Sequence, residues 1–193
     1  EGGPNISAPK DIFAPQRTNS IGFDLSDPLV LARLQAVRRS AQDWDFGDLG
    51  QVQEVLSPAT GERIGQVRFL TATQAASKIS TARPWRESPS VRAQVLRQAA
   101  DLYEAHAGEL FALLTHEAGK TLLDCVGELR EAADFLRYYA AEAEIHKASS
   151  KGIFTCISPW NFPLAIFTGQ IAAALAAGNG VLAKPAESTS IIA

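Results

Sequence analysis

The sequence predicts an α/β fold in which a helical layer precedes the start of a parallel sheet. Long helical patterns fill the middle of the 193-residue chain, ahead of two short apolar segments that end at Ile157 and Lys184 and resemble buried strands. The stretch between these segments is rich in alanine and opens with Pro163, which predicts a crossover helix and therefore one βαβ unit. A doubly wound sheet needs more strands, so we expect the amino-terminal part of a larger domain, apparently truncated.

The composition is that of an ordinary soluble protein. Hydrophobic residues make up 46% and charged residues 20% of the chain, and the formal net charge is −3. This charge argues against nucleic acid or an anionic membrane as a partner. No amino-terminal stretch has the order of a signal peptide, and the most apolar run, 162–177, is shorter than a transmembrane segment. We therefore expect a cytoplasmic protein.

The two cysteines and three histidines indicate neither a disulfide scaffold nor a metal site. The histidines lack the spacing of zinc or iron ligands, so we expect no metal. Cys156 lies in an apolar strand pattern without a basic neighbour that could activate it. Burial should raise the pKa of such a thiol, so we do not expect Cys156 to be a nucleophile.

The chain divides into three segments by pattern. Residues 1–26 contain three prolines and no long apolar periodicity, which indicates a linker or arm from a preceding module. Residues 27–150 carry helices and strands, and residues 151–193 form the βαβ unit. The elements expected before this unit are a helix from Asp27-Pro28 to about Ser40, strands Gln51–Leu56 and Arg63–Leu70 around the turn Ser57–Gly61, a helix capped by Thr73 and ending near Ala82, a longer helix from Ser88-Pro89, and a helix after Gly119 to about Ile145.

Two of these helices show a one-sided apolar pattern that predicts a buried face. The helix that begins at Ser88 carries its pattern on Val91, Val95, Leu96, Ala99, Leu102 and Tyr103. The helix after Gly119 has apolar residues alternately four and three apart, namely Leu122, Val126, Leu129, Ala133, Leu136 and Ala140. We expect the second pattern to form a narrow seam against a neighbouring helix.

Polar residues follow both strands of the βαβ unit. Asn161 comes after the first strand, Lys184 ends the second, and Glu187 follows. Open α/β sheets bind ligands at the carboxyl ends of their strands, so we expect these three side chains to converge on one crevice. Two simpler interpretations remain open: Asn161 caps the helix that Pro163 opens, and Lys184 and Glu187 form a surface ion pair.

The motifs Pro159-Trp160-Asn161 and Lys184-Pro185-Ala186-Glu187 resemble those of the aldehyde dehydrogenase superfamily, whose cofactor domain has a Rossmann-like sheet. The resemblance runs from about Gln51 to Ala193 and includes the stretches 57–61 and 117–121. Residues 128–140 and 161–170 are most similar to one branch, the L-glutamate γ-semialdehyde (1-pyrroline-5-carboxylate) dehydrogenase module of the bifunctional proline utilization A (PutA) proteins. The entry 17–26 is similar to the junction after the flavin-dependent proline dehydrogenase module of those proteins.

The resemblance implies a thiolate that attacks the aldehyde, hydride transfer to NAD and hydrolysis of the thioester. It implies that Asn161 donates into the oxyanion hole, and that Lys184 and Glu187 bind the adenosine ribose, which favours NAD over NADP. It also places Ile157, Ser158, Pro159 and Trp160 along the cofactor cleft, Phe162 around the aliphatic part of the substrate, and Glu128 near the substrate entrance. A core position for Phe162 and a solvated helix face for Glu128 remain open alternatives.

The same resemblance implies partners and missing parts. The nucleophilic cysteine and the general base lie beyond Ala193 in the family, so this segment alone should be inactive. The partners are then an aldehyde, the remainder of the polypeptide and further copies in a homo-oligomer, while FAD belongs to the upstream module. The connection 144–152 is shorter than in the family: either a stretch is missing between Ile145 and Lys151, or the shortening is real and the family's subunit contacts do not carry over. A non-catalytic module of the same fold, or a dehydrogenase for another aldehyde, is the alternative.

Overall fold

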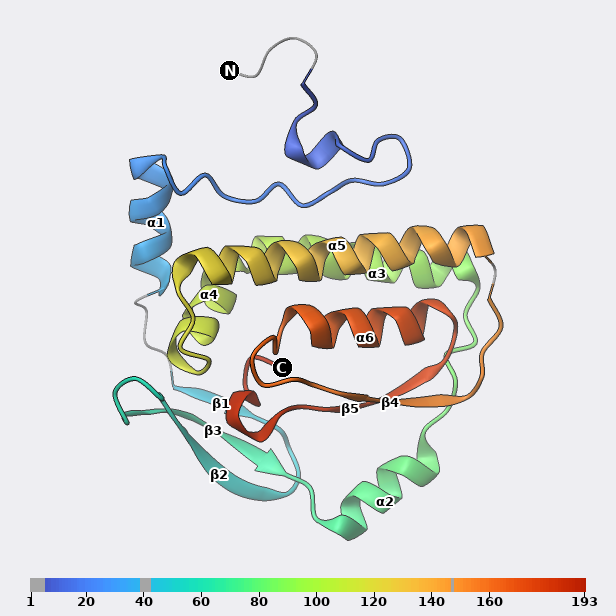
Figure 1. Ribbon diagram of the computed structural model, residues 1–193. Coiled ribbons are helices and arrows are strands. Elements are labelled where there is room, and N and C mark those ends of the chain that lie inside the picture. The colour runs from blue at the N-terminus through green and yellow to red at the C-terminus, as the bar shows by residue number, and fades with distance from the viewer. Residues whose placement is uncertain (1–5, 39–42, 147) are drawn as a thin grey trace.

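The computed structural model describes residues 6–38, 43–146 and 148–193, which form a helical layer over two small sheets (Figure 1). The elements, in chain order, are η1 (Pro9–Asp11), α1 (Pro28–Arg38), β1 (Trp44–Phe46), β2 (Gln51–Leu56), β3 (Arg63–Phe69), α2 (Ala72–Thr81), α3 (Pro89–Ala105), α4 (Ala107–His116), α5 (Leu122–His146), β4 (Ile153–Ile157), α6 (Ala165–Ala176), β5 (Gly180–Lys184) and η2 (Glu187–Thr189). Helices α3 and α5 lie side by side, α6 packs beneath them, and β4 and β5 lie below α6. This arrangement confirms the predicted α/β class.

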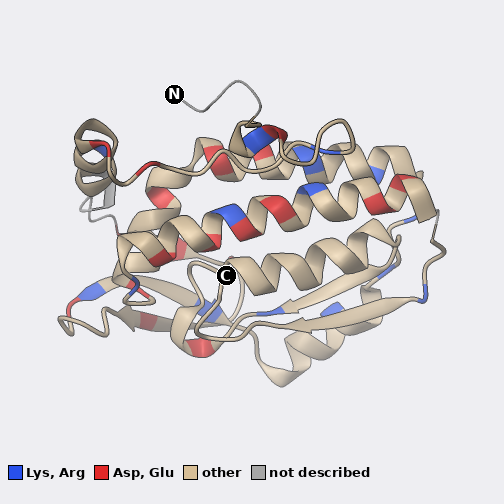
Figure 2. Cartoon of the chain, turned by 45° about the horizontal axis from the view of Figure 1, so that its top comes forward, with Lys and Arg blue, Asp and Glu red and all other residues tan. Residues whose placement is uncertain are grey.

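The predicted βαβ unit is present. Strands β4 and β5 pair in parallel from Ile153 opposite Gly180 to Ile157 opposite Lys184, and α6 connects them. Helix α6 carries no charged residue and stands out in Figure 2 as uncharged along its whole length. It begins at Ala165, two residues after the Pro163 that was expected to open it. The prediction of the unit is therefore confirmed, with a shifted helix start.

The second sheet has the order β1-β3-β2. The predicted strands β2 and β3 are antiparallel neighbours, and β1 adds a parallel partner to β3 that the sequence pattern did not indicate. Strand β1 has three residues, which is too short for an alternating pattern to be recognised.

Helix starts agree with the sequence where a side chain caps the first turn. The Ser88 Oγ accepts a hydrogen bond from the Val91 amide at 3.3 Å at the predicted start of α3. The predicted cap of α2 is wrong, because Thr71 and not Thr73 is the N-cap and forms a capping box with Gln74. Helix α1 begins as predicted, and its expected end near Ser40 lies outside the described residues.

The buried face of α5 is the predicted one. All six residues of its apolar pattern are buried, and they contribute to both hydrophobic clusters of the core. The predicted face of α3 is confirmed only in part: Leu96 is buried and Ala99 and Tyr103 pack against the core, whereas Val91, Val95 and Leu102 are exposed. The buried residues of α3 are Arg92, Ala93, Leu96 and Ala100.

The buried face of α3 is shifted from the predicted one because of partners that are distant in the sequence. The Arg92 guanidinium donates from Nε to the carbonyl oxygen of Ala176 at 3.0 Å and from Nη1 to the carbonyl of Glu87. These bonds satisfy a buried cation at the end of α6. Alanines beside Arg92 on α3 pack against α5 and α6 in one cluster.

The amino-terminal arm is attached to the helical layer. The Ser20 amide and hydroxyl donate to the Asp134 carboxylate at 2.7 and 3.0 Å, and the Ile21 amide donates to Glu104 at 3.2 Å. Figure 1 shows the arm running along α5. Among the described residues, no helix is long and apolar enough to cross a membrane.

We expect Leu129→Ala to lower the free energy of unfolding by about 2–5 kcal/mol, because Leu129 is 1% exposed between the helices. The matched control is Leu123→Ala on the same helix, which is 68% exposed and should change the free energy by less than about 0.5 kcal/mol. Urea unfolding of both variants measures the difference. Equal losses would show that α5 is packed in another orientation.

Candidate active site

The carboxyl ends of β4 and β5 bring the predicted site segments together. Ile157 lies opposite Lys184, and the Ser158 amide donates to the Lys184 carbonyl oxygen at 2.9 Å, which extends the pairing past the end of β4. The chain then runs from Ser158 to Asn161 on one side and from Lys184 to Glu187, the first residue of η2, on the other. Both polar segments therefore leave from adjacent parallel strand ends.

The three polar side chains at this edge are exposed and uncommitted. In the described part of the chain, Asn161, Lys184 and Glu187 have neither a side-chain hydrogen bond nor an ion pair. The surface ion pair between Lys184 and Glu187 is thus not formed. Asn161 does not cap α6 either. The N-cap residue of α6 is Leu164, and the helix has no side-chain hydrogen bond at this cap.

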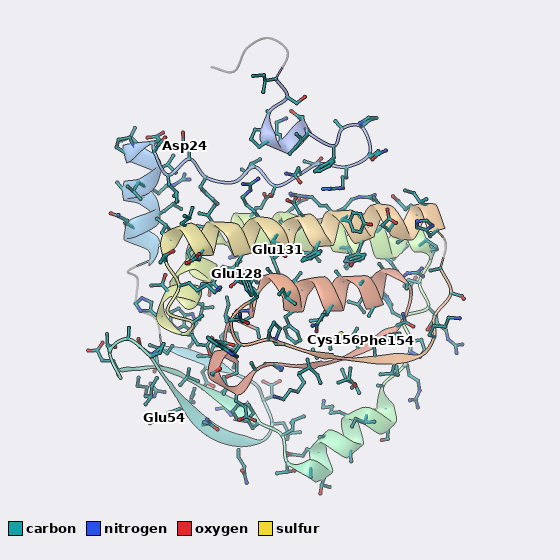
Figure 3. All side chains as sticks on the ribbon, viewed as in Figure 1. Asp24, Glu54, Glu128, Glu131, Phe154 and Cys156 are labelled. Atoms are coloured by element: carbon teal, nitrogen blue, oxygen red, sulfur yellow. The ribbon has the colours of Figure 1, made fainter. Side chains whose placement is uncertain are left out.

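The first amides of α6 are bound by a carboxylate from another helix. Glu128 on α5 accepts hydrogen bonds at Oε2 from the amides of Leu164 at 3.1 Å and Ala165 at 2.9 Å. Figure 3 shows Glu128 on the side of α5 that faces the beginning of α6. Glu128 is 2% exposed, so the alternative of a solvated helix face is wrong. Its predicted place near the substrate entrance remains a prediction.

Lys120 connects Glu128 to Phe162. The Lys120 Nζ lies 2.7 Å from the Glu128 Oε1 and 4.3 Å from the centroid of the Phe162 ring. Such a distance from a ring face permits a cation–π interaction. Phe162 is 39% exposed, which argues against the alternative that it is a core residue.

A second buried carboxylate, that of Glu117, binds the chain after η2. Its two oxygens accept hydrogen bonds from the amides of Ile191 and Ile192, each at 2.8 Å. Burial raises the pKa of Glu117, and these hydrogen bonds oppose the rise. Sequence reasoning did not assign this role to Glu117, because no local pattern links it to partners 74 and 75 positions away.

The residues expected to line the cofactor cleft differ in exposure. Ile157 and Trp160 are exposed at the sheet edge, while Ser158 is buried and donates its hydroxyl to the Pro159 carbonyl oxygen at 3.0 Å. The exposed indole of Trp160 is not enclosed in the helical core. Backbone and apolar surface are therefore accessible beside the polar groups.

Cys156 has the properties expected of a structural cysteine. It is buried in β4, and burial raises the pKa of its thiol.

Among the residues that the structure describes, no group of three or more His, Cys, Asp or Glu side chains could hold a metal ion.

Comparison with known proteins shows to which family this chain belongs. The model of the aldehyde dehydrogenase family matches residues 44–193. This chain belongs to that family. It is 42% identical to the bifunctional protein PutA of Escherichia coli over 209 residues, covering 98% of this chain and 16% of that protein. It is 44% identical to PutA of Rhizobium meliloti over 205 residues, covering 97% of this chain and 17% of that protein.

Solved structures of aldehyde dehydrogenases have the same fold. A mutant of proline utilization A from Bradyrhizobium japonicum superposes with a TM-score of 0.79 at 38% identity, covering 98% of this chain and 19% of that one. A 1-pyrroline-5-carboxylate dehydrogenase from Thermus with bound NAD gives 0.82 at 24% identity, covering 90% and 40%, which shows the fold alone. This aldehyde dehydrogenase segment thus spans less than a fifth of the three PutA proteins named here.

The E. coli alignment extends over 209 residues and this chain has 193, so that relative has residues without a counterpart here. The connection between α5 and β4 remains the predicted position of that difference.

We expect Cys156 to react with iodoacetamide far more slowly in the native protein than in urea, because burial suppresses its thiolate. Its raised pKa means that the native rate should increase only at a pH above the range of an ordinary thiol. Mass spectrometry of alkylated peptides over a pH series measures this. The denatured protein is the control, and equal rates in the two states would contradict the structural assignment.

Proposed function

We propose that this chain is the part of an NAD-dependent aldehyde dehydrogenase that supplies the oxyanion donor and the adenosine contacts of the cofactor. The observation that carries the proposal is that Asn161, Lys184 and Glu187 are exposed and uncommitted beside the carboxyl ends of two paired parallel strands. Their position is the deciding point, because open α/β sheets bind ligands at the carboxyl ends of parallel strands. This argues against the non-catalytic alternative.

The residues at this edge fit NAD. Lys184 provides a donor and Glu187 an acceptor for the ribose hydroxyls, and a carboxylate in this place repels a 2′-phosphate. The backbone of residues 157–160 provides the wall of the cleft. When bound, NAD supplies the acceptor for the hydride that leaves the aldehyde carbon. We assign no FAD contact to this chain, since FAD belongs to the proposed upstream module.

Asn161 acts on the oxygen of the aldehyde. When a thiolate attacks the carbonyl carbon, negative charge develops on that oxygen, and the Asn161 side-chain amide can donate a hydrogen bond to it. Cys156 is too buried to provide the thiolate. The family resemblance places the nucleophile and the general base in the part of the polypeptide that follows this sequence, so we propose that the segment alone does not turn over substrate.

The substrate we propose is L-glutamate γ-semialdehyde, which is oxidised to L-glutamate in proline catabolism. Support comes from the PutA relatives, which are 42–44% identical across almost the whole chain. We further propose that the full-length protein is a cytoplasmic, bifunctional homo-oligomer whose other module is a proline dehydrogenase. An assay of the full-length protein with the semialdehyde and NAD tests this assignment directly, and activity only with other aldehydes would contradict it.

In the full-length protein, Asn161→Ala should lower kcat by about 10²–10³, because one oxyanion donor is lost. Binding of NAD should change little, since Asn161 is not proposed to contact the adenosine. Steady-state kinetics and NAD titration by intrinsic fluorescence separate the two effects. Gln170→Ala on the exposed side of α6 is the control. A parallel loss of NAD affinity would mean that Asn161 has a structural role.

Glu187→Gln should weaken NAD binding and reduce the preference for NAD over NADP, because the anion that repels a 2′-phosphate is removed. Dissociation constants for both cofactors, measured with the full-length protein, give the result. Glu87→Gln changes an exposed carboxylate elsewhere and should alter neither constant. Unchanged affinities in Glu187→Gln would refute the ribose contact.

A further inference from the structure

The corner between α4 and α5, residues 117–121, contacts the chain on both sides of the candidate site. Glu117 binds the amides that follow η2, and Lys120 reaches Phe162 beside Asn161. The corner was recognised in the sequence only as part of the family resemblance. Nothing in the proposed chemistry uses it, so its contacts require an explanation.

The backbone of the corner is fixed at both ends. Gly119 has a φ of +66°, a conformation that favours glycine, and the Lys120 amide donates to the Leu114 carbonyl oxygen at 3.1 Å. Thr121 caps α5, since its Oγ1 accepts from the Asp124 amide at 3.2 Å and donates to the Asp124 carboxylate at 2.6 Å. The Lys120 side chain therefore projects from a well-defined position.

The ammonium group of Lys120 forms an ion pair with the Glu128 carboxylate, which is in turn fixed by hydrogen bonds from α6. Its partner Glu128 is 2% exposed and is bound at its other oxygen by two amides of α6. The Lys120 side chain is only 13% exposed, so water screens this pair weakly. Glu131 is a further carboxylate near the pair, and its pKa is raised by burial and by the charge of Glu128.

The Phe162 ring lies against the Lys120 ammonium of this ion pair. Phe162 follows Asn161 directly and precedes the capped start of α6. The chain at Leu164 and Ala165 is fixed by Glu128, while the ring lies 4.3 Å from the Lys120 ammonium. Lys120 and Glu128 together thus fix both the backbone after Phe162 and the face of its ring.

We propose that Lys120 is a positioning residue, which orients the Phe162 ring for the aliphatic part of the aldehyde without touching the reacting carbon. The inference rests on the proposed function. It assigns to Lys120 a role in substrate affinity that is separate from the oxyanion and cofactor contacts. The aldehydes concerned are those with a chain long enough to pack on an aromatic ring.

The test compares Lys120→Met with wild type in the full-length protein. Methionine keeps an unbranched apolar chain and removes the charge, so the KM for the semialdehyde should rise by about 10-fold through loss of the cation–π contact. The values of kcat and of the KM for NAD should stay within about 2-fold, since neither depends on the ring. Lys120→Arg should restore most of the affinity, and Lys78→Met on the exposed surface of α2 is the matched control.

Two further measurements separate positioning from general damage. The KM for acetaldehyde should be unaffected in Lys120→Met, because acetaldehyde has no chain to pack on Phe162. In a Phe162→Leu background, Lys120→Met should add little to the KM of the semialdehyde. If Lys120→Met fails to fold because Glu128 is left unpaired, the double variant Lys120→Met/Glu128→Gln removes both charges and should show the same rise.

The outcomes distinguish this inference from the proposed function. A wild-type protein without NAD-dependent oxidation of any aldehyde would refute the proposed function itself. An active wild type in which Lys120→Met and the double variant behave like Lys78→Met would overturn the positioning role alone. A fall in kcat with an unchanged KM for the semialdehyde would also overturn it, because it would place Lys120 in the chemical step.

Discussion

The buried carboxylate of Glu128 is the interaction on which the arrangement of the site depends. Removing a carboxylate from water is costly unless its oxygens are bound on all sides. In Glu128, Oε2 accepts hydrogen bonds from two amides of α6, and the Lys120 ammonium lies 2.7 Å from Oε1, where it compensates the charge although Oε1 accepts no hydrogen bond. Because Glu128 satisfies the first amides of α6 from outside the helix, α6 can begin directly after the segment that contains Asn161 without a side-chain cap from its own sequence.

Because Glu128 binds the first amides of α6, the Asn161 side chain is not needed as a helix cap and forms no hydrogen bond within the described residues. The other end of the βαβ unit is fixed in a comparable way by Asn179, whose Oδ1 accepts from the amides of Lys151 at 2.6 Å and Gly152 at 3.1 Å. Its side-chain amide donates to the Ala174 carbonyl oxygen at 3.1 Å. The unit is thus held at both ends by side chains that do not belong to the ligand edge, and the groups at that edge stay available.

Local patterns predicted those features whose causes are local. The six apolar residues of α5, the Ser88 cap and the parallel strands were all predictable from spacing and composition. The face of α3 was predicted only in part, because the buried Arg92 side chain donates to a carbonyl oxygen 84 positions away. The role of Glu128 was missed for the same reason, as its amide partners lie 36 and 37 positions along the chain. The site residues themselves came from motif resemblance, and the structure adds which of them are uncommitted.

The two buried glutamates of the α4–α5 region differ in how their charge is compensated. Glu128 has an ammonium partner, whereas the described contacts of Glu117 are backbone amides, and burial raises its pKa. Glu117 holds the segment that follows η2, and Glu128 holds the segment beside Phe162. Glu117 lies in the corner, whereas Glu128 lies on α5, seven residues after the corner ends. The α4–α5 region therefore holds the chain on both sides of the candidate site, at Ile191 and Ile192 through Glu117 and at Leu164 and Ala165 through Glu128.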